Sequence, residues 1–177
     1  MGTDSAKLFN KALADQILAM QSGQLTSFLE ENIGVLQRKP SNLSLVLFEM
    51  ERNGGSASSA VERLLSGEQT LTELRADIAQ DFAFGDEEIL LDYWGCYAHV
   101  FDGHPEGAIT SCDYLPEQEE EIFLLLRPEH VDQMIQSLHA HEDDLSVMGK
   151  GDIERLEGWR DFCASDTSYM VAYLFDY

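Results

Sequence analysis

The sequence predicts an α+β fold, with a helical N-terminal half and a small mixed or antiparallel sheet with helices in the C-terminal half. Over the first 80 residues the apolar side chains recur at intervals of three and four, as on one face of a helix. After Asp81, short runs rich in Ile, Leu, Val and aromatic residues take over, which is typical of strands. The length of 177 residues and a hydrophobic content of 44% suit one globular core. We therefore expect a single domain over residues 1–177, with a soft internal boundary near residues 81–86.

The first half of the chain is expected to form short helices. Asp4 or Ser5 is placed to cap the first one, which continues until Gly23 ends it. Thr70 and Glu73 have the spacing of a capping box at the start of another. Further helices are expected over residues 26–33, 43–52, 56–65 and 70–80, with residues 45–48 alternatively forming a strand.

The second half is expected to supply the sheet. Strands are expected within residues 88–100, 108–114, 121–126 and 169–177. Pro128 suits the first position of a helix between two of them, because proline needs no hydrogen-bond acceptor there. The inner face of that helix would carry Val131, Met134, Ile135 and Leu138. Asp152 is expected to cap the last helix, with Ile153, Leu156, Trp159 and Phe162 facing inward.

The distribution of charge is the most informative feature of the sequence. The chain has 33 Asp and Glu against 11 Lys and Arg, a net charge of −22. Residues 76–126 hold 13 of the acids and not one Lys or Arg, whereas soluble surfaces normally mix both signs. A surface this negative repels phosphate groups, so direct binding to nucleic acid or to an anionic membrane is not expected.

Aromatic side chains stand among these acids, and this pattern predicts a protein interface. Charge would guide the encounter with a basic protein, and a ring would supply buried contact. The alternatives are a surface kept acidic only for solubility, or a nucleic-acid mimic whose carboxylates stand where phosphates would lie in a partner's groove. The candidate partner-binding residues are Asp86, Glu87, Glu88, Asp92, Tyr93, Tyr114, Glu117, Glu119, Glu120 and Glu121.

Two groups contain residue types that bind metals. Cys96, His99, His104 and Cys112 could form a tetrahedral zinc site, and hence a metal-dependent hydrolase. However, Cys96 and His99 would point to opposite faces of a strand, and the second pair lacks compact ligand spacing. Residues 139–144 read as a solvated helix end or as a weak divalent-cation site.

Catalytic signatures are missing from the sequence. It has no nucleophile elbow, no phosphate-binding loop and no dinucleotide-binding glycine motif. We therefore expect a binding protein rather than an enzyme, without catalytic residues, bound metal or cofactor.

The cellular compartment is expected to be the cytoplasm. The chain has three cysteines, Cys96, Cys112 and Cys163, whereas a disulfide framework is usually built from a larger, even number. The N-terminal residues lack the basic and apolar stretches of a signal peptide, and the apolar runs are too short to span a bilayer.

Two resemblances follow from these features. A small, acidic chain of mixed α and β structure without catalytic motifs resembles bacterial immunity proteins that neutralise toxins, which implies a toxin as the basic partner. Residues 123–131, 152–162 and 170–174 look like the C-terminal strand–helix–helix–strand of the YfbM-like family of small bacterial proteins. The first 80 residues do not follow that family's pattern, and neither resemblance supplies a catalytic residue.

Overall fold

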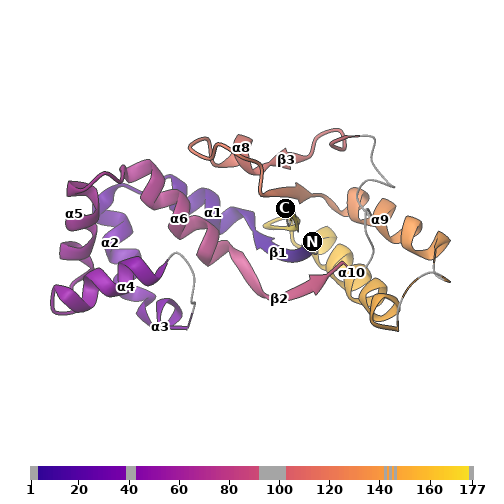
Figure 1. Cartoon of the computed structure of the whole chain (residues 1–177), viewed down its shortest axis with the longest axis horizontal. Coiled ribbons are helices and arrows are strands. Elements are labelled where there is room, and N and C mark those ends of the chain that lie inside the picture. The colour runs from indigo at the N-terminus through magenta and orange to yellow at the C-terminus, as the bar shows by residue number, and fades with distance from the viewer. Residues whose placement is uncertain are drawn as a thin grey trace. The chain divides into compact units, whose positions relative to one another are not determined.

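A computed structural model of the chain describes residues 4–38, 43–91, 103–141, 143, 145 and 147–175. These residues form nine helices and a five-stranded antiparallel sheet, which confirms the predicted α+β class (Figure 1). The chain divides into two compact units by its internal contacts. We call residues 12–83 the helical unit, and residues 1–11 with 84–177 the sheet unit.

The helical unit agrees with most of the sequence prediction, but the first helix ends at Leu18, and Gly23, its predicted end, lies inside the second helix. Its helices are α1 (Lys11–Leu18), α2 (Ser22–Glu31), α3 (Ile33–Leu36), α4 (Leu43–Arg52), α5 (Ala57–Ser66) and α6 (Leu71–Ala83). The Ser56 side chain caps α5 by accepting the Ser59 N–H at 3.3 Å. The Thr70–Glu73 capping box forms as predicted, with its two bonds at 3.1 and 2.6 Å. The strand alternative for residues 45–48 is wrong, because these residues lie within α4.

The helix predicted to begin at Asp4 or Ser5 is wrong over its first residues. Ser5–Asn10 is strand β1, and helix begins only at Lys11. Ala6 and Phe9, on opposite faces of β1, are both fully buried. The strand therefore lies inside the sheet, and pairing on both of its edges overrides an apolar spacing that also fits a helix.

The sheet has the strand order β2-β1-β5-β4-β3, and every neighbouring pair is antiparallel. The other strands are β2 (Phe84–Leu90), β3 (Ile109–Thr110), β4 (Phe123–Leu126) and β5 (Tyr169–Leu174). The N-terminal and C-terminal strands pair along their full length, from Ser5 opposite Leu174 to Asn10 opposite Tyr169. The predicted strands at 121–126 and 169–177 are confirmed in β4 and β5, whereas residues 92–100 of the predicted strand region lie outside the described residues.

The strand predicted over residues 108–114 is only partly right. Two residues form β3, and Ser111–Tyr114 then forms the short helix α8. Thr110 explains the change, because its side chain accepts the Asp113 N–H at 3.1 Å and so starts a helix.

Two helices, α9 (Pro128–Ala140) and α10 (Val147–Ser165), pack together against one face of the sheet (Figure 1). The predicted inner face of α9 is confirmed, and Pro128 occupies the first turn as expected. The prediction for α10 needs two corrections. Asp152 lies inside the helix rather than at its cap, and Phe162 is 40% exposed, while neighbouring Cys163 is buried in its place.

The opposite face of the sheet holds an aromatic cluster. The Phe9 ring lies 5.0 Å from Phe84, 5.6 Å from Tyr114 and 5.6 Å from Phe123, measured between centroids. The Phe84 and Phe123 rings are 5.4 Å apart. Four rings from β1, β2, α8 and β4 thus bury one another, with Phe9 at the centre.

We expect Phe9→Ala to destabilise the sheet unit strongly. The change leaves a cavity at the centre of the cluster and should lower the free energy of unfolding by about 3–5 kcal/mol, measured by urea unfolding. Phe162→Ala is the matched control, because that ring is 40% exposed, and it should cost under about 1.5 kcal/mol. Equal losses for the two variants would contradict the placement of β1 within the sheet.

Candidate functional site

The negative charge is concentrated in the sheet unit. This unit has 23 Asp and Glu against six Lys and Arg, a net charge of −17, whereas the helical unit has ten against five, a net charge of −5. The predicted partner-binding residues all belong to the sheet unit. Asp92 and Tyr93 lie outside the described residues, and the other eight can be placed.

Asp86, Glu87 and Glu88 are three consecutive exposed carboxylates on β2. Among the described strands, β2 is at an edge of the sheet. Its pairing with β1 is irregular, since Lys7 lies opposite Glu88 and Phe9 lies opposite Phe84. Residues 85–87 therefore lie opposite Leu8 alone, as in a β-bulge, and this irregularity presents the carboxylates at the edge of the sheet.

The second acidic group precedes β4. Glu117, Glu119 and Glu120 are exposed, while Glu121 is half-buried and lies 2.9 Å from the His104 ring. Ser111 fixes the end of this segment, because its hydroxyl accepts the N–H groups of Ile122 and Phe123 at 2.8 and 3.4 Å.

The strand register relates the two acidic groups to each other. Leu90, Ser5, Leu174 and Phe123 are successive partners in one row across four strands. The end of β2 and the start of β4 therefore lie at the same end of the sheet. At about 4.8 Å per strand spacing, they are about 14 Å apart. We call Asp86, Glu87, Glu88, Glu117, Glu119, Glu120 and Glu121 the acidic surface.

Two further residues lie at this end of the sheet, where the sequence did not predict them. Asp4 lies next to the row, where its carboxylate accepts the Tyr173 hydroxyl at 2.6 Å and its carbonyl accepts the Leu91 N–H at 2.8 Å. His104 is held beside Glu121. Asp4 is more than 80 residues from Glu88 in the chain, so only the pairing of β1 brings it here.

Tyr114, which the sequence predicts as a partner-binding residue, packs in the aromatic cluster. Its half-buried ring packs edge-on against Phe9, and the Lys11 ammonium lies 5.6 Å from the ring centroid. The part of the ring that faces the cluster contributes to the core, so only its remaining exposed part is available to a partner.

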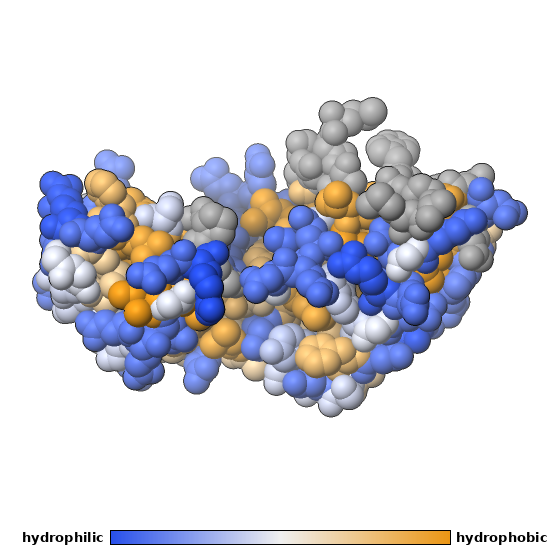
Figure 2. Space-filling view, turned by 90° about the horizontal axis from the view of Figure 1, so that it is seen from below, coloured by the Kyte–Doolittle hydropathy of each residue, from blue (hydrophilic) through white to orange (hydrophobic). Residues whose placement is uncertain are grey.

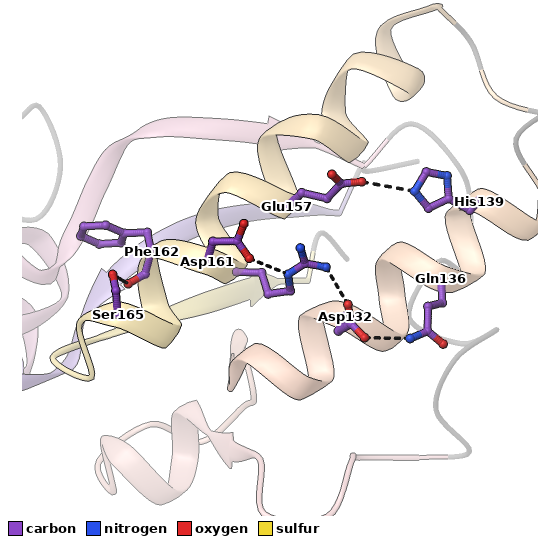
Figure 3. Close-up of polar contacts among 8 residues, drawn as sticks. Asp132, Gln136, His139, Glu157, Asp161, Phe162 and Ser165 are labelled. Carbon is purple, nitrogen blue, oxygen red and sulfur yellow. Dashed lines mark hydrogen bonds and ion pairs between the residues drawn. The ribbon is translucent and has the colours of Figure 1, made fainter.

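The contacts described for the cations of the sheet unit are mostly with groups other than these carboxylates, although Lys7 lies opposite Glu88 in the strand register. Arg160 on α10 pairs with Asp132 on α9 at 2.6 Å and with Asp161 at 3.0 Å (Figure 3). Arg127 pairs with Glu129 at 2.8 Å. Arg127 also donates to the Glu106 carbonyl at 3.3 Å. Arg155 contacts Asp152, the backbone carbonyl of Glu88 and the Trp159 ring. Lys7 and Lys11 lie over the rings of Phe84 and Tyr114.

His130 fastens the loop before β3 to the start of α9. Its Nδ1 accepts the Arg127 N–H at 3.2 Å, so its Nε2 carries the proton and donates to the Glu106 carbonyl at 3.2 Å. Burial, and secondarily the Arg127 charge, lower the pKa of the imidazole below its ordinary value of 6.5. Gly107 gives the loop its shape, since its φ is +78° and a Cβ there would lie 2.9 Å from the Arg127 guanidinium.

Neither of the possible metal sites is assembled by the described residues. Cys96 and His99 fall outside them, His104 pairs with Glu121, and Cys112 is half-buried on α8. In residues 139–144, His139 instead contacts Glu157 at 3.2 Å (Figure 3). His141 contacts the Ser137 carbonyl at 2.9 Å. Across the described ranges, no group of three or more His, Cys, Asp or Glu side chains is placed to hold a metal ion.

Cys163 is unsuited to nucleophilic chemistry. Burial, followed by the nearby Asp166 carboxylate, raises the pKa of its thiol to about 11. The thiolate that would attack a substrate is therefore scarce at neutral pH.

Comparison with known proteins gives no relative: no family model, no curated protein and no solved structure matches the chain. None of the helices in the described ranges is long and apolar enough to cross a membrane. Hydrophilic side chains dominate the face shown in Figure 2, with small hydrophobic groups between them.

The His130 contacts predict a pH dependence of stability. Because the folded-state pKa lies below 6.5, the unfolded state binds more protons as the pH falls through this window, and stability is lost. We expect the free energy of unfolding to decrease between about pH 7.5 and 5 in urea titrations. His130→Gln, whose amide can replace both hydrogen bonds, should flatten this change, whereas the exposed His141→Gln should not. An unchanged slope in His130→Gln would show that His130 does not cause the loss.

Proposed function

We propose that the protein binds a basic protein partner through the acidic surface of its sheet unit. One observation carries the proposal. The sheet unit has six Lys and Arg, and the contacts described for five of them are with carboxylates of α9 and α10, with aromatic rings, or with backbone carbonyls, that of Glu88 among them. Within the described residues, no ion pair involves Asp86, Glu87, Glu88, Glu117, Glu119 or Glu120. Their mutual repulsion destabilises the unit, and a cationic partner would relieve it.

The geometry favours a partner that touches two places at once. The row from Leu90 to Phe123 spans about 14 Å by three strand spacings, and a basic surface wider than this row would contact the β2 carboxylates and the segment before β4 together. The exposed apolar side chains Leu90 and Ile122, 52% and 39% exposed, lie beside these two groups. They supply apolar contact within a charged rim, which is the usual composition of a protein interface.

The specific form of this proposal is an immunity protein that inhibits a basic toxin in the cytoplasm. It rests on the acidic surface and on the resemblance in size, charge and mixed fold. Steering by opposite charge gives an inhibitor rapid association, which is what neutralisation of a toxin requires. A nucleic-acid mimic that occupies a defence protein's groove shares the same chemistry, and competition between the partner and DNA or RNA would distinguish it.

The proposal is tested first by capture and then by kinetics. The protein is immobilised, exposed at low salt to lysate of its native host and to the product of the neighbouring gene, and eluted with a salt gradient. A single polypeptide that elutes as the salt rises is then purified, and its association rate is measured at several ionic strengths.

We expect Glu119→Lys combined with Glu120→Lys to slow association with that polypeptide by about tenfold or more at low salt. The matched control is Glu30→Lys with Glu31→Lys, two adjacent exposed acids on α2 that give the same change in net charge. The control should change the rate by less than about twofold if location matters rather than total charge. Equal slowing by both pairs, or by neither, would contradict the acidic surface as the binding site.

A further inference from the structure

The helical unit contains a pocket that has no part in the acidic surface. Its volume is about 390 Å³, and it lies between α4, α5 and the loop that leads to α6. This volume is in the range of small-molecule sites. The pocket is lined by Leu45, Glu49, Arg63, Leu64, Ser66, Gly67, Glu68 and Gln69.

Glu49 is a buried carboxylate in the wall of this pocket. The residue is 8% exposed, and its Oε2 accepts no hydrogen bond from the described residues. The Arg63 Nε lies 2.8 Å from that oxygen, so the two side chains form an ion pair whose geometry is not that of a hydrogen bond. Burial of a carboxylate without a hydrogen bond is costly, and a donor that enters the pocket would remove this cost.

Arg63 is a displaceable partner for Glu49. Its side chain is 48% exposed, whereas that of Glu49 is 10% exposed. A half-exposed arginine can turn into solvent at little cost, because water hydrates the freed guanidinium. Glu49 has no such freedom, so a second cation could take the position of Arg63 beside it.

Gln69 provides a second acceptor. Its Nε2 donates to Asp77 Oδ2 at 2.8 Å, which fixes the orientation of the amide and leaves Oε1 as the free acceptor. That oxygen is buried and has no hydrogen-bond partner among the described residues. The lining therefore contains a buried carboxylate that is ion-paired with a half-exposed arginine, and a buried amide oxygen without a hydrogen bond from the described residues. Both residues lie next to the apolar side chains of Leu45 and Leu64.

We propose that this pocket binds a small aliphatic amine. The ammonium group would bind the Glu49 carboxylate in place of Arg63, with the Gln69 carbonyl oxygen as a further acceptor. The alkyl chain would lie along Leu45 and Leu64. Glu49, Glu68 and Arg63 give the lining a net charge of −1, which favours a cation over an anion. The site lies in the helical unit and does not depend on the proposed function of the sheet unit.

The test uses n-butylamine as the probe, with butyrate as the anion of similar shape and methylamine as the cation without a chain. Binding is followed on the full-length ¹⁵N-labelled protein through the amide shifts of Leu45, Leu64, Gly67 and Gln69. We expect saturable shifts with n-butylamine, weaker ones with methylamine and none with butyrate. Shifts spread evenly over the acidic chain, without saturation at these residues, would overturn the proposal.

Two variants of opposite effect make the test specific. Glu49→Gln keeps the shape of the side chain and should weaken n-butylamine binding about tenfold or more, the value of a charged hydrogen bond. Arg63→Gln removes the competing cation and should strengthen binding by about threefold, a gain that misfolding cannot produce. Glu62→Gln, an exposed acid on the same helix, is the control without effect. Butyrate binding that Arg63→Gln abolishes would show an anion site and contradict the proposal.

Discussion

The pairing of β1 with β5 holds the sheet unit together. β1 is the first strand of the chain and β5 the last, and they pair over all six residues of each. β2 joins the described sheet only through β1, and β4 and β3 join it only through β5. The acidic groups on β2 and before β4 therefore keep their separation because this one contact is maintained. The chain between the two strands must close into a long loop before they pair, which costs conformational entropy. Burial of both faces of β1 and β5 offsets this cost.

The second constraint is electrostatic. A unit with a net charge of −17 must fold against its own repulsion, and its few cations contact groups that build the fold. Arg160 and Arg127 stabilise α9 and α10, while Lys7 and Lys11 lie over the aromatic cluster. The carboxylates of β2 have a further effect, since charge and a bulge at a sheet edge discourage pairing with another strand. The proposed binding of a basic partner would use the same side chains as this protection of the edge. The two roles are distinguished by whether association with the partner depends on the position of the charge.

The sequence predicts those elements whose local signals agree with their surroundings. The capping residues Ser56 and Thr70 and the proline at position 128 place three helices, because each satisfies or avoids a backbone donor at a helix start. The strand nature of residues 5–10 could not be predicted, because the pattern of Leu8 and Phe9 also fits a helix and the deciding partners are 75 to 169 residues away. The acids of the candidate site stand out by composition alone, whereas Asp4 joins them only through strand pairing. No feature of the sequence predicts the pocket at Glu49, because a single acid in an amphipathic helix has the same sequence pattern whether it is buried or exposed to solvent.

The most direct test of the account maps the partner's footprint on the protein. The ¹⁵N-labelled chain is titrated with the polypeptide recovered by salt elution, and amide shifts are followed residue by residue. The account predicts that the largest changes fall on residues 86–88 and 117–122 and decline as salt is added. Changes centred on α2, α4 or α5 of the helical unit, or salt elution that releases no polypeptide, would contradict the acidic surface as the binding site.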